Sequence, residues 1–132
     1  MNLTYKVNEP VKVEDVIELF RNSGINRPLD QKERIQKMLD QSDIILSAWD
    51  HEKIVGIARA ITDFSYCCYL SDLAVDKACQ RRGIGKELLA KLREMIGDGV
   101  TLILLSAPSA MDYYPKVGFE KIENGFMIRR SQ

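Results

Sequence analysis

The residues with the clearest capacity for chemistry lie between Gln80 and Lys86. This segment combines two glycines with two arginines and a lysine, in the order Gln80-Arg81-Arg82-Gly83-Ile84-Gly85-Lys86. Apolar residues then recur at helical spacing, at Ile84, Leu88, Leu89, Leu92, Met95 and Ile96. The first turn of a helix presents unpaired backbone N–H groups and the positive end of the helix dipole, and glycine lets a ligand approach that backbone closely. The segment therefore predicts a binding loop for a phosphate-bearing ligand.

Two common phosphate-binding loops do not fit these residues. A P-loop has a glycine, four spacer residues, and then Gly-Lys followed by Ser or Thr, whereas Gln80 and Glu87 hold the first and last of these positions here. The dinucleotide fingerprint Gly-x-Gly-x-x-Gly needs a third glycine where Leu88 stands. A glycine turn with a solvated basic cluster, binding nothing, is the alternative to a phosphate site.

The remaining pattern is Gln-x-x-Gly-x-Gly, which follows an apolar strand (Tyr69–Val75) and opens a helix. It resembles the pyrophosphate loop of the GCN5-related N-acetyltransferase (GNAT) family, which binds acetyl-coenzyme A. Two further segments are similar to family motifs in the expected order. Leu70–Val75 resembles the central strand, and Tyr113–Phe119 resembles the late helix that closes on Tyr-x-x-x-Gly-Phe. The resemblance runs from Leu3 to Arg130 and implies the acyl-CoA N-acyltransferase fold.

Length and composition agree with one enzyme domain over residues 1–132. Of the 132 residues, 45% are hydrophobic and 29% are charged, as in ordinary globular proteins. Lys plus Arg equals Asp plus Glu at 19 each, so no net basic charge argues for a nucleic acid partner. No apolar run is as long as a membrane span, and the N-terminus lacks the apolar core of a signal peptide. Cys67, Cys68 and Cys79 have neither disulfide nor zinc-site spacing, so we expect no metal and a cytoplasmic location.

Alternating strand and helix signals predict an α/β fold with a mixed, mostly antiparallel sheet flanked by helices. The expected strands are Leu3–Asn8, Ile44–Trp49, Ile54–Thr62, Tyr69–Val75 and Val100–Leu105. Helices are expected over Val13–Asn22 with Gly24 as C-cap, from Asp30 with Glu33 as its capping-box partner, and from Ile84. The nearly all-apolar strand Val100–Leu105 is typical of a sheet covered on both faces.

The C-terminal residues predict a hairpin. Asn124-Gly125 is a favoured hairpin turn, and it separates the apolar segments Phe119–Glu123 and Phe126–Arg130. Phe126 and Met127 would then lie on an open sheet edge, and an open edge invites pairing. We therefore expect a homodimer.

The resemblance implies how acetyl-CoA is held. Backbone groups of the central strand at Leu73, Ala74 and Val75 would pair with the pantetheine amides, as an added strand would. The pyrophosphate would lie on the loop residues Gln80, Arg81, Arg82, Gly83, Ile84, Gly85 and Lys86. Family members often carry an asparagine early in the late helix that touches the cofactor, and Ser109 stands nearest that position.

Amine acetylation needs a route for the amine proton, a donor for the oxyanion and an acid for the departing thiolate. Tyr114 holds the family position of that acid, although Tyr113 and Tyr114 could instead be packed aromatics with hydroxyls at the surface. The single histidine, His51, lies in an expected solvent-facing turn, which argues against a histidine-based hydrolase. We therefore expect direct attack by the amine in a ternary complex, without an acyl-enzyme. Cys79, beside the loop, is the rival nucleophile.

Asp72 is the candidate base, because burial of a carboxyl in an apolar strand would raise its pKa. Two other readings stay open. Its charge could be satisfied by backbone N–H groups or a nearby basic side chain, or the amine proton could leave through water.

The acceptor is expected to be a small amine rather than a protein lysine. Phe64, Tyr66 and Tyr69, with Trp49 on a neighbouring strand, would line an aromatic pocket that holds an aromatic or apolar amine by cation–π attraction. The segment Ser47–Val75 is also similar to the arylamine-type, serotonin-acetylating branch of the family. Aromatics at these spacings are, however, more often part of a core.

Two functions of other classes remain as alternatives. The first is a catalytically silent sensor or interaction module that binds coenzyme A without turnover. The second is a nucleotide-binding regulator that uses the same helix N-terminus, which the missing third glycine disfavours.

Overall fold

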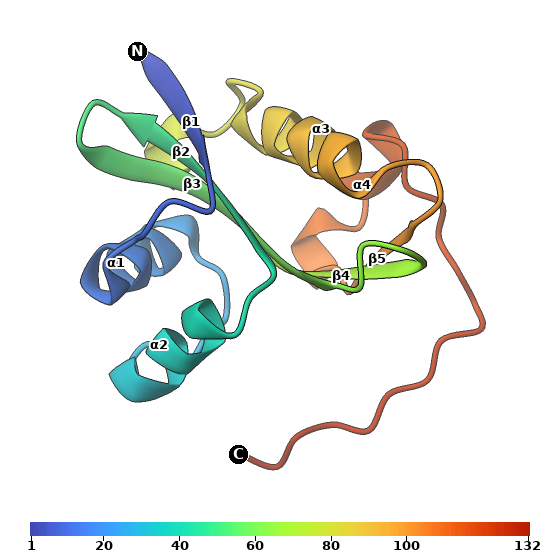
Figure 1. Cartoon of the computed structure of the whole chain (residues 1–132). Coiled ribbons are helices and arrows are strands. Elements are labelled where there is room, and N and C mark those ends of the chain that lie inside the picture. Colours follow the sequence, from blue (N-terminus) through green and yellow to red (C-terminus); the bar gives the residue numbers. More distant parts are fainter.

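A five-stranded sheet forms the centre of the computed structural model, which describes residues 1–132 (Figure 1). Its strands are β1 (Leu3–Val7), β2 (Ile44–Asp50), β3 (Lys53–Thr62), β4 (Cys67–Val75) and β5 (Thr101–Leu104). They lie side by side in the order β1-β2-β3-β4-β5. Neighbours are antiparallel except β4 and β5, which are parallel. The predicted mixed, mostly antiparallel sheet is confirmed.

Helices cover both faces of this sheet. They are α1 (Val13–Ser23), α2 (Lys32–Asp40), α3 (Ile84–Ile96) and α4 (Tyr113–Lys116), with short 3₁₀ turns at Lys77–Cys79 and Pro108–Ala110. In Figure 1, α1 and α2 lie on one side of the sheet and α3 on the other. The C-cap of α1 is Gly24 in the left-handed conformation, as predicted. Pro115 lies inside α4, which is only four residues long.

The two faces carry separate hydrophobic clusters. Beneath α3, five residues of that helix pack on β2, β3 and β4; they are Ile84, Leu88, Leu89, Leu92 and Ile96. On the other face, α1 and α2 contribute Val13, Val16, Leu19, Phe20, Ile35 and Leu39 to a cluster that also contains Trp49. Helix α3 lies close to the sheet because β3 has Gly56, where a Cβ atom would stand 2.9 Å from Cγ2 of Ile84.

Strand β4 contains a β-bulge at Ser71. Arg59 of β3 pairs with Asp72, and the next residue, Ala60, pairs with Leu70, so Ser71 has no partner in β3. The extra residue reverses the alternation of faces: Leu70 belongs to the cluster beneath α3, whereas Ala74 belongs to the cluster beneath α1 and α2. Pairing with β5 extends only from Cys67 to Leu70. The edge of β4 beyond the bulge therefore has no strand beside it.

Two local predictions are wrong. The helix after Pro28 begins at Lys32 with Gln31 as N-cap, and no side chain caps it, so Asp30 and Glu33 form no capping box. Strand β5 is not covered on both faces, because it is the last strand of the sheet and Ile103 is 41% exposed. Its apolar residues alternate between the core and solvent.

The predicted hairpin around Asn124-Gly125 is also absent. Residues 119–132 contain no strand, and Phe126 and Ile128 are fully exposed. A two-stranded ribbon is stable only when one of its faces packs on a core, and beyond Phe119 this segment does not do so. Instead the segment curves away and returns toward α2 (Figure 1), where the Arg34 guanidinium donates a hydrogen bond to the main-chain oxygen of Gln132 over 3.1 Å.

Candidate active site

The predicted phosphate loop ends at the exposed N-terminus of α3. Gly83 is the N-cap at φ 78°, and no side chain caps the helix. Arg81 also has a positive φ of 67°, so the loop turns sharply twice before the helix starts. The backbone N–H groups of Ile84, Gly85 and Lys86 have no partner within the helix. A Cβ atom on Gly83 would meet no atom within 4 Å, so the approach to these donors is open. The loop fits an anion.

The loop is tied to the end of β4. Nε2 of Gln80 donates to the carbonyl oxygen of Val75 over 3.1 Å. Asp76, which is buried, accepts from the backbone N–H of Ala78 over 2.9 Å and donates its own N–H to Val55 over 2.9 Å. Sequence analysis did not single out Asp76, although an aspartate two residues ahead of a turn N–H is a familiar turn signal. These bonds fix the α3 N-terminus beside the open edge of β4.

That open edge contains Leu73, Ala74 and Val75, the residues expected to pair with pantetheine. On one side they pair with Ala58, Ile57 and Gly56 of β3, and on the other no strand is present. A sheet edge can accept an extended ligand by backbone hydrogen bonding, and a helix N-terminus can accept a phosphate. The two features together fit an extended ligand that carries both amides and a diphosphate.

Two adjacent tyrosines lie in α4, and the hydroxyl of Tyr113 reaches this region. The hydroxyl oxygen of Tyr113 lies 3.0 Å from the position that a Cβ atom on Gly85 would occupy, which places it at the first turn of α3. Tyr114 packs edge-on against Tyr113 and Phe119, with ring centroids 5.3 Å and 5.5 Å away. Burial raises the pKa of both tyrosines above 10.0, and the neighbouring Tyr113 adds to the rise at Tyr114. Both hydroxyls are therefore protonated donors at neutral pH.

Ser109 lies in the 3₁₀ turn ahead of α4 and is exposed. No hydrogen bond joins its side chain to the loop. Its contact with the cofactor stays a prediction.

Asp72 is buried between two arginines. Its Oδ1 accepts from Nε of Arg27 over 2.6 Å, and its Oδ2 accepts from Nε of Arg59. The same guanidinium groups donate to Ser71: Arg27 to its carbonyl oxygen over 2.7 Å and Arg59 to its hydroxyl over 2.8 Å. The arrangement supports the reading in which basic side chains satisfy the carboxylate. Because both oxygens already accept from guanidinium groups, Asp72 is poorly placed to take a proton from an amine.

A cavity of about 660 Å³ lies beside the bulge. It is lined by Asn26, Arg27, Pro28, Gln31, Arg34, Met38, Arg59, Tyr69, Ser71, Leu105, Arg130 and Gln132. These residues come from the connection between α1 and α2, from α2, from β3 and β4, from the end of β5 and from the C-terminal segment. The cavity therefore opens at the point where β4 and β5 separate.

Only one of the aromatic residues expected to line the acceptor site lines this cavity. Tyr69 lines the cavity, but Phe64 and Tyr66 lie in the connection between β3 and β4 and do not. Trp49 is buried beneath α1 and α2, where its Nε1 donates to the Ser47 hydroxyl over 2.8 Å. Of the predicted aromatic lining, this cavity therefore contains Tyr69 alone, and a role for Phe64 and Tyr66 in binding the acceptor stays a prediction.

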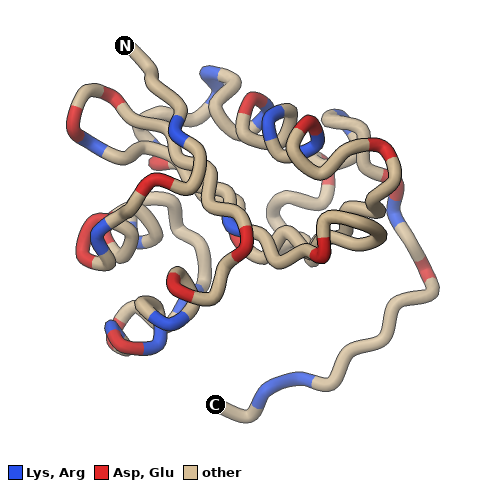
Figure 2. Tube along the Cα trace, viewed as in Figure 1, with Lys and Arg blue, Asp and Glu red and all other residues tan.

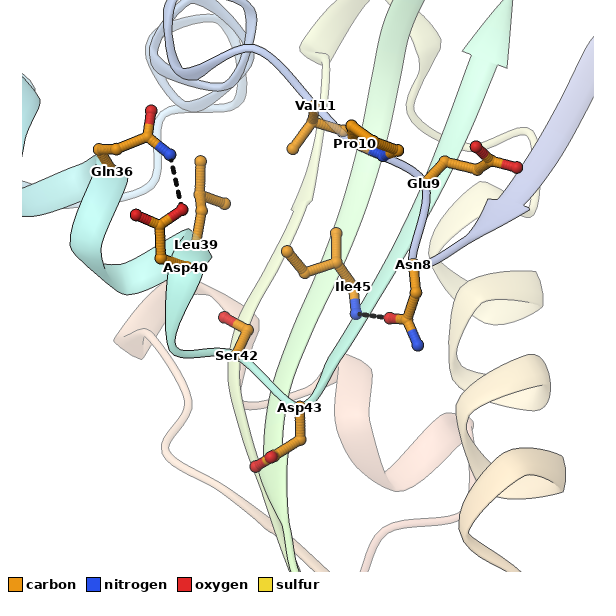
Figure 3. A pocket seen from close by; sticks show the side chains of 10 residues that line it. All are labelled: Asn8, Glu9, Pro10, Val11, Gln36, Leu39, Asp40, Ser42, Asp43 and Ile45. Carbon is orange, nitrogen blue, oxygen red and sulfur yellow. Dashed lines mark hydrogen bonds between the residues drawn. The ribbon is translucent and has the colours of Figure 1, made fainter.

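A smaller cavity of about 390 Å³ lies between the start of β2, α2 and the segment after β1 (Figure 3). Two hydrogen bonds cross its lining: Asn8 accepts from the Ile45 N–H over 2.8 Å, and Gln36 donates to Asp40 over 2.9 Å. None of the loop, β4 or α4 residues discussed above lines it. It is not part of the candidate active site. His51, the only histidine, is also remote; it lies in the β2–β3 turn with its side chain 77% exposed.

Among the helices, none combines the length and the apolar character needed to cross a membrane.

Comparison with known proteins identifies the family. The family model described as "Acetyltransferase (GNAT) domain" matches residues 12–128. The N-acetyltransferase ycf52 of Gracilaria tenuistipitata var. liui is 25% identical over 90% of this chain and 68% of its own length. The chloroplastic serotonin N-acetyltransferase 2 of Oryza sativa subsp. japonica is 29% identical over 77% of this chain and 53% of its own length. The chain thus spans about half of the latter protein.

Among solved structures, a GNAT family acetyltransferase from Streptococcus pneumoniae TIGR4 superimposes with a TM-score of 0.77 at 27% identity, covering 98% of this chain and 99% of that one. The overall fold described above is thus shared with a known class of enzymes. The chain belongs to the GNAT family and is an acetyl-CoA-dependent N-acetyltransferase.

Proposed function

We propose that this enzyme acetylates the primary amine of a small molecule by direct attack on acetyl-CoA, without an acyl-enzyme. One observation carries the proposal. The unpaired edge of β4 runs from the bulge at Ser71, which lines the cavity of about 660 Å³, to Val75, whose carbonyl oxygen accepts from the loop that precedes the uncapped N-terminus of α3. A cofactor site and an acceptor site would therefore adjoin along this edge, as a ternary complex requires.

The chain's own residues supply the cofactor site. The backbone N–H groups of Ile84, Gly85 and Lys86 would bind the pyrophosphate, with Arg81, Arg82 and Lys86 adding charge. Leu73, Ala74 and Val75 would pair with the pantetheine. Acetyl-CoA supplies the activated thioester. The residues around it position the reacting groups and protonate the departing thiolate.

Tyr114 remains the proposed general acid for the departing thiolate, because it occupies the tyrosine position of the family motif. Its raised pKa keeps it protonated and thus able to donate. Tyr113 becomes a specific rival, because its hydroxyl lies over the first turn of α3. Replacing each tyrosine separately distinguishes the two.

No carboxylate is free to act as base in the acceptor cavity, so we propose that the amine loses its proton to water. Guanidinium groups line this cavity. An ammonium group among them would have its pKa lowered, since neighbouring positive charges disfavour its charged form. Asp72 then acts as a positioning residue that holds Arg27, Arg59 and, through them, the bulge.

The silent coenzyme A sensor is the alternative function. Release of the free thiol from acetyl-CoA on addition of a panel of small amines separates it from the enzyme. Turnover with any amine supports the proposal. Binding of acetyl-CoA in calorimetry, without thiol release from the whole panel, would favour the sensor.

Three expectations stay predictions: a homodimer, a cytoplasmic location and a chain that is one domain over residues 1–132. The homodimer no longer rests on a hairpin edge, but Phe126 and Ile128 remain fully exposed apolar residues that an interface would cover. A concentration-independent monomer mass in sedimentation would rule the dimer out.

A further inference from the structure

The acceptor cavity has an unusual charge. Its 12 lining residues include the four arginines Arg27, Arg34, Arg59 and Arg130, and neither aspartate nor glutamate. In the chain as a whole, 19 basic residues balance 19 acidic ones. Figure 2 shows the two signs mixed along α1 and α2, and basic residues near the C-terminus that come back toward α2. Positive charge is therefore concentrated at this cavity.

Only part of that charge is neutralised. Arg27 and Arg59 share one carboxylate, that of Asp72. Arg34 donates to the side-chain oxygen of Gln31 over 3.3 Å and to the main-chain oxygen of Gln132 over 3.1 Å, and no aspartate or glutamate lies within ion-pair distance. Arg130 has no acidic partner either. Asp72 is thus the one aspartate or glutamate that pairs with any of these four arginines.

Arginine is suited to one class of ligand group. Its planar fork of N–H donors matches the oxygens of a carboxylate or a phosphate, and such charge-assisted pairs are the stronger hydrogen bonds. A second positive charge on the acceptor would instead meet repulsion from the same groups. The cavity therefore favours an acceptor with an anionic group and disfavours polyamines and other polycationic amines.

We propose that the natural acceptor is a primary amine that also carries a carboxylate or phosphate group, and that Arg34 binds this group. The proposal rests on the proposed function and names its substrate class. Arg34 is the residue to test because it lines the cavity, is only partly exposed and has no acidic partner. Arg27 and Arg59 are less suitable for testing, because their loss would unpair Asp72.

The test compares matched amines by thiol release from acetyl-CoA. Glycine, γ-aminobutyrate and 6-aminohexanoate are each compared with their methyl esters, phosphoethanolamine is compared with ethanolamine, and putrescine serves as the dication. We expect at least one anionic amine to have a KM at least tenfold below that of its ester or alcohol partner, which lacks the anionic group, and putrescine to be the poorest acceptor. The carboxylate and phosphate arms identify which anion is bound.

Variants then assign the effect to the residue. Arg34→Ala should raise the KM for the anionic amine by about 10- to 100-fold, the loss expected for a charged hydrogen bond. The KM for its ester or alcohol partner, which lacks the anionic group, should change less than twofold. Arg34→Lys should restore part of the lost affinity for the anionic amine. Arg21→Ala is the matched control, because Arg21 is an exposed residue of α1 paired with Glu18 and does not line the cavity. Calorimetric affinity for acetyl-CoA should be unchanged in all three variants.

The outcomes separate the two proposals. Turnover of esters, ethanolamine or putrescine with a KM equal to or below that of the anionic partners would overturn the anionic acceptor and leave the enzyme function standing. An anionic preference that Arg34→Ala does not reduce would overturn the role of Arg34. Absence of thiol release with every amine would contradict the proposed function, and the substrate class with it.

Discussion

The hydroxyl of Tyr113 occupies the space beside Gly85 that any larger residue would need, with 3.0 Å between the hydroxyl oxygen and the position of a Cβ atom. Residues from α4 and from the first turn of α3 thus touch at a point where glycine is required for two reasons. A side chain at position 85 would displace the tyrosine, and it would also cover the N–H donors that face the ligand. The spacing of the two glycines in the loop therefore fits the packing of α4 as well as the proposed binding of phosphate.

The loop glycines should be required for cofactor binding. Gly85→Ala should weaken acetyl-CoA binding by displacing Tyr113, and Gly83→Asp should weaken it severely by adding negative charge at the helix N-terminus. Gly83→Ala has open space but must adopt a positive φ, which costs about 1–2 kcal/mol of stability. Calorimetric titration with acetyl-CoA measures these effects. Gly125→Ala is the control, because a Cβ atom there meets nothing within 4 Å. Wild-type affinity in a Gly83→Asp, Gly85→Asp double variant would contradict the phosphate-loop assignment.

The two tyrosines should differ in their effect on turnover. Tyr114→Phe removes only a hydroxyl, so folding and acetyl-CoA affinity should survive while kcat falls by about 10- to 1,000-fold, the range of general-acid catalysis. Steady-state kinetics with a responsive amine provides the measurement, and Tyr113→Phe provides the matched comparison. If Tyr113→Phe carries the loss and Tyr114→Phe keeps full turnover, the acid is Tyr113. Full turnover in both variants would contradict the mechanism. So would an acetylated Cys79 trapped by mass spectrometry, if Cys79→Ala removed both the acetyl group and the activity.

Asp72→Asn should destabilise the protein. Removing one partner of a buried ion pair leaves uncompensated charge, which typically costs about 3–5 kcal/mol, and here two guanidinium groups lose the same carboxylate. Urea unfolding measures the change. Glu14→Gln, which breaks the exposed pair with Lys32, should have little effect and is the control. If Asp72→Asn abolishes turnover while leaving the unfolding midpoint unchanged, Asp72 acts as a base and the positioning role is wrong.

The charge on Asp63 should make the free energy of unfolding depend on pH. Its Oδ1 accepts from the backbone N–H groups of Ser65, Tyr66 and Cys67 in the β3–β4 turn, and these bonds lower its pKa from 3.8 to about 2. A group whose pKa is lower in the folded state stabilises that state above the unfolded pKa. This contribution is lost as pH falls from about 4 toward 2. As the pH is lowered through this range, the unfolding midpoint should fall less steeply in Asp63→Asn than in the wild type. Identical slopes would show that the turn does not depend on the charge.

Local sequence signals predicted the start of α3 and most elements correctly. Glycines, basic residues and helical spacing lie within one short segment, so the start of α3 at Ile84 could be placed without knowledge of the rest of the chain. The Asn124-Gly125 signal failed for the opposite reason. A turn sequence specifies a bend, but strands form only where a core accepts their apolar face, and nothing local reports that.

The proposed acceptor site was harder to predict because it depends on distant pairings. The bulge at Ser71 exists only in the register of β4 against β3, and the partners of Asp72 come from the α1–α2 connection and from β3. The sequence identified Asp72 as costly to bury, but it could not name Arg27 and Arg59 as the groups that offset this cost. The arginine cavity is thus a property of tertiary structure.

The separation of the hydrophobic core into two clusters has an evolutionary consequence. The cluster beneath α3 supports the helix that begins at the proposed cofactor loop, and the cluster beneath α1 and α2 supports the helices whose connection lines the proposed acceptor cavity; the two clusters have no buried residue in common. Substitutions that reshape α1, α2 and their connection can therefore alter acceptor choice while the machinery for acetyl-CoA is retained. A lineage can explore new substrates on one side of the sheet without rebuilding the other.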